Sequence, residues 1–507
     1  MPYEMNNHEE KSAPARRGRV GFSPPIFRGG AKHTLQSGSG RDSPIARLIP
    51  VALVIMGVVS LYLWWKRDAA AQFILRLPIP ENLPQSSIDE NGEGTIRTEF
   101  LRLDGVPADL PGAWPRFRGA NFDAISTENV DLAQTWGPDG PAVLWSIDVG
   151  EGYAGPAILA GKVYILDYDR QKQADVIRCL SLEDGKDIWR YSYTVRVKRL
   201  HGMSRTVPAV TEKYVVTLGP KCHVTCLDSV TGEFRWMLDL VKDFNATVPD
   251  WYAGQCPLID DDKAIIGVGG DALIMAVDCE TGEILWQSPN PNKWVMTHSS
   301  VVPAEFMGTR MYVYCASGGV VGVRSEDGSI LWENNEWNIR VANVATPVIV
   351  GEGLIFLAGG YNAGAMMLKL TRDNDTINAQ PLFRLGSQVF GSEQHTPIFY
   401  QGHIYGIRPD KHLVCLDLNG QVVWTSPPTH LFGPRGLGPY MIADGKIYIM
   451  NDEGVLTLAQ ASPTGYVQLS EAKVLQGPES WGPMALACGR LIVRDMNKMI
   501  CLDVSGQ

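Results

Sequence analysis

The stretch CLDSVTGEFRW (Cys226–Trp236) decides the fold of this chain, because the same eleven-residue pattern returns along much of the sequence. Alternating apolar residues, one of them small, predict a strand that leads into the unit. A Thr-Gly or Asp-Gly pair supplies the positive φ of a tight hairpin turn, and the returning strand ends on a Trp that can fill the space between neighbouring sheets. The other copies are Cys179–Trp189, Ala276–Trp286, Gly322–Trp332 and, one residue shorter, Cys415–Trp424.

A second unit precedes each hairpin and begins with a Pro, followed after a few residues by a Gly and a Val-Tyr or Ile-Tyr pair, as in GPAILAGKVYIL (Gly155–Leu166). Eight such units of about 45 residues, each long enough for four short strands, predict an all-β fold. The expected architecture is an eight-bladed β-propeller of four-stranded antiparallel blades. The repeated prolines are Pro156, Pro208, Pro257, Pro303, Pro347, Pro397, Pro439 and Pro483.

The two ends of the repeat array complement each other. The last unit reaches Cys501 where its Trp strand should follow, and a Trp strand without a unit of its own lies at residues 143–149. We therefore expect residues 113–507 to form the propeller, with its ring closed by pairing of 143–149 with 499–504. Two blades lack the Trp, and Phe383 and Val467 stand in its place. The Trp side chains expected to dock between blades are Trp145, Trp189, Trp236, Trp286, Trp332 and Trp424.

The nine cysteines are an odd number in a long chain and do not indicate the disulfide framework of a small secreted domain. Four of them occupy the small-residue position of the hairpin unit, where we expect buried, weakly polar side chains without a redox role. These four are Cys179, Cys226, Cys415 and Cys501.

Residues 48–65 form an 18-residue run without a charge, long enough for one transmembrane signal-anchor helix. Tyr62, Trp64 and Trp65 stand at its end, where aromatic rings favour the headgroup layer. A buried core helix is the first alternative, but it would normally show a polar face. A cleaved signal peptide is the second, but 47 residues exceed an ordinary n-region.

Charge predicts how the chain is arranged about the membrane. Residues 1–47 hold eight Lys and Arg and no apolar periodicity, so we expect a disordered basic tail in the cytoplasm. Residues 66–112 are expected to be a linker. The propeller would then be extracytoplasmic, in the periplasm. The net charge is −10 over the whole chain and −16 beyond residue 67, which argues against nucleic-acid binding.

The hairpin units resemble the tryptophan-docking repeat of the quinoprotein alcohol dehydrogenase-like propellers, from about residue 143 to the end. The segment Trp114–Asn121 is similar to the WPxFRGxN motif of many PQQ-like repeat proteins. The resemblance implies one of two functional classes. The dehydrogenases hold pyrroloquinoline quinone (PQQ) with calcium in the central funnel, whereas the outer-membrane protein assembly propellers hold no cofactor and act as scaffolds. The fold does not choose between these classes.

Features that the resemblance associates with the enzymes are missing from the sequence. There is no vicinal Cys-Cys pair, and Cys222-His-Val-Thr-Cys226 has the spacing of neither a haem nor a zinc site. GxSxG, HExxH and P-loop motifs are also absent, so we predict no catalytic residue and no metal ligand. Asp260–Asp262 is interpreted as a solvated turn, with calcium binding as the alternative.

Polar and aromatic residues that precede the repeated prolines should line one face around the propeller axis. This face suits a protein partner or a small polar ligand. We therefore expect a membrane-anchored binding or protein-interaction scaffold without a cofactor; the alternative is a PQQ- and calcium-dependent alcohol or sugar dehydrogenase. A third reading is a sensor that signals through the cytoplasmic tail. The candidate residues are Arg205, His298, Asn343, His395, Arg435 and Trp481.

Overall fold

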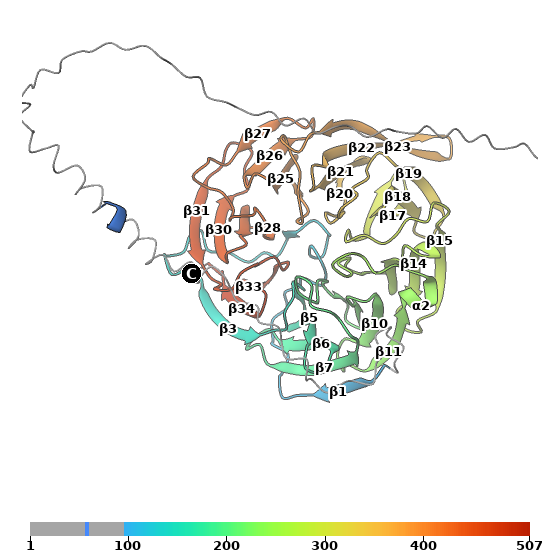
Figure 1. The fold of residues 1–507 in the computed structure, drawn as a ribbon, viewed down its shortest axis with the longest axis horizontal. Helices are drawn as coiled ribbons and strands as arrows, with labels where there is room; N and C mark the ends of the chain where they lie inside the picture. Colours follow the sequence, from blue (N-terminus) through green and yellow to red (C-terminus); the bar gives the residue numbers. More distant parts are fainter. Residues whose placement is uncertain (1–55, 60–95, 507) are drawn as a thin grey trace, which may run out of the picture. The chain divides into compact units, whose positions relative to one another are not determined.

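The computed structural model describes residues 56–59 and 96–506 of the chain. The unit formed by residues 82–507 contains eight sheets arranged in a ring, six with four strands and two with five (Figure 1). Four strands of each sheet make up one blade. The four strands of a blade run antiparallel to their neighbours, and in every blade except the last they follow each other in the sequence. This arrangement confirms the predicted all-β, eight-bladed propeller.

The first four blades each contain four consecutive strands. Blade 1 has β4 (Ala157–Leu159), β5 (Lys162–Asp169), β6 (Ala174–Ser181) and β7 (Asp187–Thr194). Blade 2 has β8 (Ala209–Val210), β9 (Tyr214–Leu218), β10 (His223–Asp228) and β11 (Phe234–Asp239), followed by helix α2 (Leu240–Phe244). Blade 3 has β12 (Leu258–Asp260), β13 (Lys263–Gly267), β14 (Ala272–Asp278) and β15 (Ile284–Pro289). Blade 4 has β16 (Val302–Phe306), β17 (Thr309–Ala316), β18 (Gly319–Arg324) and β19 (Ile330–Asn334).

The remaining blades repeat this order, except that the last takes its outermost strand from the N-terminal side. Blade 5 has β20 (Val348–Gly351), β21 (Leu354–Gly359), β22 (Gly364–Asp373) and β23 (Thr376–Leu385). Blade 6 has β24 (Ile398–Tyr400), β25 (His403–Ile407), β26 (Leu413–Asp417) and β27 (Val422–Thr425). Blade 7 has β28 (Tyr440–Ala443), β29 (Lys446–Met450), β30 (Val455–Gln460) and β31 (Gln468–Lys473). Blade 8 has β32 (Ala485–Ala487), β33 (Arg490–Arg494), β34 (Lys498–Asp503) and β3 (Ala142–Asp148).

Trp residues of the outer strands connect one blade to the next, although they lie at the third or fourth position of these strands and not at their ends as the repeat predicted. Trp145 Nε1 donates to the Leu182 carbonyl of the following blade at 3.0 Å, and Trp236 and Trp424 make the equivalent bond at 2.9 Å. In blade 5 the ring of Phe383 takes the same place: a Cβ added to Gly420 of the next hairpin would lie 2.7 Å from it. The hairpin glycines therefore serve both the turn and the contact between blades.

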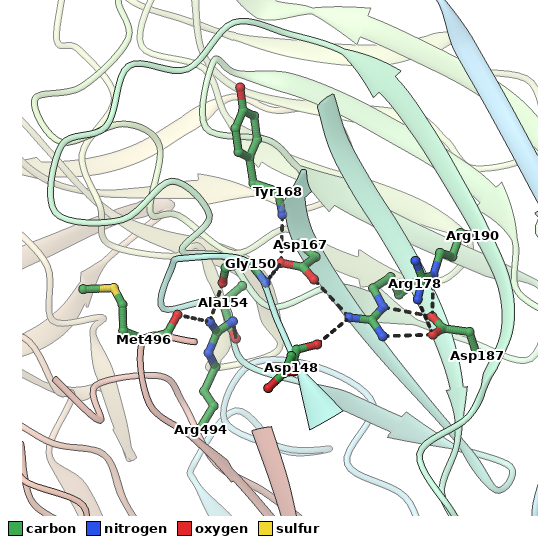
Figure 2. Close-up of polar contacts among 10 residues, drawn as sticks. All are labelled: Asp148, Gly150, Ala154, Asp167, Tyr168, Arg178, Asp187, Arg190, Arg494 and Met496. Carbon is green, nitrogen blue, oxygen red and sulfur yellow. Dashed lines mark hydrogen bonds and ion pairs between the residues drawn. The ribbon is translucent and has the colours of Figure 1, made fainter. Parts of the chain in front are cut away.

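The ring closes in blade 8, where β3 pairs with β34 and Trp145 lies opposite Cys501. A buried polar clasp holds the chain as it leaves β3 for blade 1 (Figure 2). Arg494 donates to the carbonyls of Gly150 at 2.9 Å and Ala154 at 3.2 Å. Arg178 of β6 donates to the Asp148 carbonyl at 3.3 Å from the other side. Main-chain carbonyls that would otherwise be buried without donors are satisfied in this way.

Part of the linker predicted for residues 66–112 is structured. Strand β1 (Thr98–Arg102) pairs with β7 as a fifth, outermost strand of blade 1. The strand could not be recognised from its sequence, because all five residues are exposed and pairing at a sheet edge depends on main-chain hydrogen bonds.

Residues 114–126, here called the plug segment, close one end of the central channel. Trp114 forms a β-bridge with Ile158 of blade 1, and β2 (Ile125–Ser126) pairs in parallel with β28 of blade 7. The guanidinium of Arg118 fastens the segment to blade 6 through the carbonyls of Thr396 and Pro397, each at 3.0 Å. The WPxFRGxN motif therefore marks a structural element of the propeller.

Most of the predicted signal-anchor helix at 48–65 lies outside the described residues, as do the predicted tail at 1–47 and linker residues 66–95. Residues 56–59 alone are described, and they are helical. Within the described part of the chain, no helix has the length and apolar character needed to cross a membrane. All nine cysteines lie in the described part as free thiols, and all except Cys488 are buried.

Candidate ligand-binding funnel

The channel end opposite the plug segment opens into a cavity of about 340 Å³. Its walls come from the loops that precede the inner strands, and its floor is Phe117 of the plug segment. These loops connect the outer strand of one blade to the inner strand of the next, so they are free to differ between blades and to carry the chemistry of a site. We call this cavity the funnel.

A chain of stacked side chains forms one side of the funnel. The guanidinium of Arg205 lies 5.1 Å from the centre of the Tyr153 ring, and Tyr153 stacks on Trp481 with ring centres 5.1 Å apart. Arg435 lies 5.5 Å from the centre of the Trp481 ring. Glu479 ties the chain together, because it accepts from Tyr153 Oη at 2.7 Å and from Arg435 Nη1 at 3.2 Å. The arrangement presents flat aromatic surface with cations beside it.

Arg205 carries its charge without an ion pair among the described residues. Its guanidinium donates to the carbonyls of Trp251, Leu200 and His201, the last two at 3.1 and 3.3 Å. Burial lowers its pKa, partly offset by Tyr153, Tyr252 and Glu479. Since carbonyl groups do not cancel its charge, the Arg205 guanidinium can attract an anionic group of a ligand.

Two histidines on the other walls are held in the neutral form. Burial, assisted by the charge of Arg205, lowers the pKa of His298 to about 4. Burial lowers the pKa of His395 to about 3, and its Nε2 has no hydrogen-bond partner within the described structure. A neutral imidazole has one donor and one acceptor nitrogen, so both side chains can orient a polar ligand at neutral pH.

Several bulky residues of the funnel have left-handed backbone conformations. The φ angles are 51° at His201, 61° at Trp251 and 54° at Tyr361, all three of which line the cavity. The supporting Glu479 has a φ of 62°. Such conformations are costly for large side chains and concentrate at functional sites, where the surrounding structure enforces them.

The structure brings four of the six predicted face residues together: Arg205, His298, His395 and Trp481 line the same cavity. Arg435 lies behind Trp481 and contacts its ring. Asn343 is buried, and its carbonyl accepts from the backbone N–H groups of His298 and Ser299 at 3.1 and 3.0 Å. It therefore supports the loop that carries His298 and does not face the funnel.

The six predicted residues leave out twelve of the sixteen residues that line the cavity, among them Tyr153, Phe117 and Tyr361. Tyr153 precedes the first repeated Pro by three positions, so the rule used for the other blades would have found it. Phe117 lies inside the WPxFRGxN motif, whose position in the channel depends on tertiary contacts. Tyr361 comes from the turn between β21 and β22, for which the repeat gives no signal.

The lining of the funnel does not fit calcium-bound PQQ. Calcium prefers oxygen ligands and carboxylates above all, yet no Asp or Glu lines the cavity in the described structure. No cluster of three or more His, Cys, Asp or Glu side chains in the described part of the chain has the arrangement of a metal site. The lining suits instead a ligand with a planar or apolar portion and an anionic or hydrogen-bonding group.

Comparisons with known proteins agree with this architecture. A family model described as outer membrane protein assembly factor BamB matches residues 173–426, half of the chain. No curated protein matches the sequence.

Among solved structures, BamB from Moraxella catarrhalis is 15% identical, with a TM-score of 0.50, over 72% of this chain and 100% of that one. A europium-containing methanol dehydrogenase is 13% identical, with a TM-score of 0.55, over 76% of this chain and 90% of that one. At these identities the structural likeness establishes the fold alone.

Proposed function

The chain belongs to the PQQ-like repeat family whose model is described as outer membrane protein assembly factor BamB, and from this premise we propose that it is a binding propeller without a quinone cofactor. The funnel takes either a segment of a protein partner or a small polar ligand, and the blades act as a rigid scaffold around it. Membership of the family supports a scaffold role but does not specify the partner.

One observation carries the proposal: among the described residues, the funnel lining combines an aromatic stack, an Arg without an ion pair and two neutral imidazoles, and it contains no Asp or Glu. Clustered aromatic and Arg side chains are the residues that most often dominate binding energy at protein interfaces. His395 Nε2 and Trp481 Nε1 line or adjoin the cavity without a hydrogen-bond partner in the described structure.

We also propose the placement of the protein in the cell. The uncharged run at 48–65 anchors the chain in a membrane as a single-pass protein, with the basic residues 1–47 on the cytoplasmic side. The propeller then faces the extracytoplasmic space, where a partner meets the funnel. The runner-up function, a PQQ-dependent alcohol or sugar dehydrogenase, shares this placement but requires a calcium site that the funnel lining does not offer.

Site-specific photocrosslinking in cells tests the proposal. Benzoylphenylalanine replaces Gln394 on the funnel wall in the full-length chain, and a matched variant carries it at Val422, which is exposed on the outer strand β27. We expect a discrete crosslinked species from position 394 and none from position 422. Equal crosslinking from both positions would overturn the proposal. No crosslinking from either position, with the protein folded and abundant, would rule out the protein partner and leave the small polar ligand.

The structure also identifies the better charge variant for this test. Arg205 holds three loop carbonyls, so its replacement changes the fold of the funnel wall as well as its charge. Arg435 has an exposed side chain with one ion pair to Glu479. Arg435→Gln should therefore weaken the crosslink from position 394 at unchanged thermal stability.

A further inference from the structure

The plug segment satisfies the inner strand edges of some blades with its own main chain. The N–H and C=O groups of Trp114 and Ile158 exchange two hydrogen bonds of 2.8 Å on blade 1, and Val210 N of blade 2 donates to the Pro115 carbonyl at 2.9 Å. On blade 7, Ile442 N donates to the Ala124 carbonyl at 2.9 Å, next to the short β2–β28 ladder. An extended main chain can therefore form the hydrogen bonds that these strand edges would otherwise lack.

In the described structure the plug segment makes no backbone hydrogen bond to the inner strands of blades 3, 4, 5, 6 and 8. Its Arg116 and Arg118 side chains donate to carbonyls of blades 3 and 6 instead, whereas β16 of blade 4 and β20 of blade 5 have neither kind of hydrogen bond to it. A cavity of about 450 Å³ lies there, between residues 118–123 of the plug segment and the inner strands of blades 4 and 5. We call it the lower cavity. It is separate from the funnel, with which it shares no lining residue.

The inner strands of blades 4 and 5 are among the least buried. Every residue of β8, β28 and β32 is buried, whereas only the first residue of β16, of β20 and of β24 is buried. Ile349 and Val350 of β20 and Phe122 of the plug segment are half-buried apolar side chains that line the lower cavity. The uncovered part is therefore an apolar trough beside two strand edges.

The hairpin geometry identifies which backbone groups face the trough. Phe306 and Thr309 flank a two-residue turn, so they form a hydrogen-bonded pair, and the next pair, Glu305 and Arg310, does not exchange hydrogen bonds. The N–H and C=O groups of Glu305 consequently point away from β17, toward the channel. Its carboxylate has no ion pair within the described residues, whereas Arg310 is paired with Asp260 and Asp261.

We propose that the lower cavity is a second binding site, which takes an extended apolar peptide segment bearing a Lys or Arg, added as a strand to β16. Blades 1, 2 and 7 provide the precedent, because there the main chain of the plug segment pairs with inner strands at the same end of the channel. The apolar residues of the peptide fill the trough against Phe122 and Val350, and its cation meets Glu305. Strand addition of this kind derives affinity from main-chain bonds and selectivity from alternate side chains.

Selection from a phage-displayed library of random heptapeptides tests the site on the full-length protein in detergent. Enriched peptides are synthesised with a fluorophore, and their affinity is measured by anisotropy. Glu305→Pro removes the outward N–H without breaking a bond to β17, and Val350→Trp fills the trough. We expect each to weaken binding at least tenfold, Glu305→Gln to weaken basic peptides only, and the funnel variant Trp481→Ala to have no effect.

Amide hydrogen exchange tests whether the edge of β16 is free in the protein alone. It therefore distinguishes a peptide from another part of this chain as the occupant of the lower cavity. The N–H of Glu305 should exchange rapidly in the protein alone and slowly with the peptide bound. Slow exchange in the free protein that Val350→Trp does not change would mean that another part of this chain already covers the edge. A dimer in light scattering that Val350→Trp dissociates would assign the trough to a second copy. Either result, or selected peptides insensitive to Glu305→Pro and Val350→Trp, would overturn the proposal.

Discussion

The two ends of the central channel are built on different principles. At the funnel end, side chains from variable loops meet in a cavity that combines aromatic rings, Arg205 and two neutral histidines. At the plug end, one segment crosses the channel and is held by main-chain bonds and the buried Arg118. The comparison shows that the side chains suited to ligand binding lie in the loops, whose sequences the repeat does not constrain. At the plug end we expect a few residues, Arg118 above all, to determine stability.

The largest loss of stability should follow from replacing Arg118, which holds the plug segment in place. Arg118 donates to four carbonyls, those of Phe122, Asp123, Thr396 and Pro397, at 2.9 to 3.1 Å. Arg118→Ala leaves buried acceptors unpaired, so we expect a loss of about 3 to 5 kcal/mol in the free energy of unfolding, measured with urea. Arg116→Ala, which removes one bond to Ile259, is the matched control and should cost about 1 kcal/mol. Equal losses for the two variants would contradict the role of Arg118.

A smaller loss is expected from the clasp beside the funnel end. Arg494 is 1% exposed and bridges blade 8 to the carbonyls of Gly150 and Ala154. Arg494→Ala should cost about 2 to 3 kcal/mol, less than Arg118→Ala, because the β3–β34 ladder still closes the ring. The same urea experiment measures it. A loss larger than that of Arg118→Ala would reverse the order of the two ends.

The funnel histidines predict a pH dependence that the plug end should not share. Because the pKa of His395 falls from 6.5 to about 3, the folded protein binds fewer protons than the unfolded chain between these values. The stability associated with His395 is therefore present above pH 6.5 and is lost as the pH falls, by up to about 1.4 kcal/mol per pH unit.

The variant His395→Gln isolates this contribution. Its thermal midpoint should fall less steeply than that of the wild type between pH 6.5 and 4. His403→Gln on β25 is the control, since its ring contacts only the Gln401 carbonyl at the surface. Comparison with the wild type also cancels Asp175, whose pKa burial raises to about 8 and whose effect has the opposite sign. Parallel profiles for His395→Gln and the wild type would contradict the buried neutral state.

The smallest stability effect belongs to the exposed cation of the funnel. Arg435 pairs with Glu479 at 3.2 Å with a 57% exposed side chain, and such pairs contribute less than about 1 kcal/mol. Arg435→Gln should therefore shift the thermal midpoint by no more than a degree or two while it reduces crosslinking from position 394. A large loss of stability would show that the stack on Trp481 is structural and not a binding surface.

The propeller could be predicted because each blade repeats the same sequence pattern. The hairpins with a Trp and the regularly spaced prolines indicated the number of blades. The lone Trp145 strand likewise indicated how the ring closes, and β3 lies beside β34. Strand β1 could not be predicted in this way, since it attaches through main-chain bonds that require no side-chain pattern. The WPxFRGxN motif of the plug segment was visible in the sequence, but its attachment to blades 1, 6 and 7 was not. In the funnel, the lining residues that precede the repeated prolines could be predicted from their position in the repeat. Phe117 and Tyr361 could not, because they come from other parts of the chain.

Isothermal titration of PQQ with calcium into the full-length protein tests the central claim most directly, namely that this PQQ-type propeller is a binding module without the cofactor. We predict no saturable heat and no dye-linked oxidation of alcohols or sugars, because the funnel offers no carboxylate to a calcium ion. Saturable binding at micromolar affinity or tighter that Trp481→Ala abolishes, accompanied by oxidation of an alcohol, would contradict the claim.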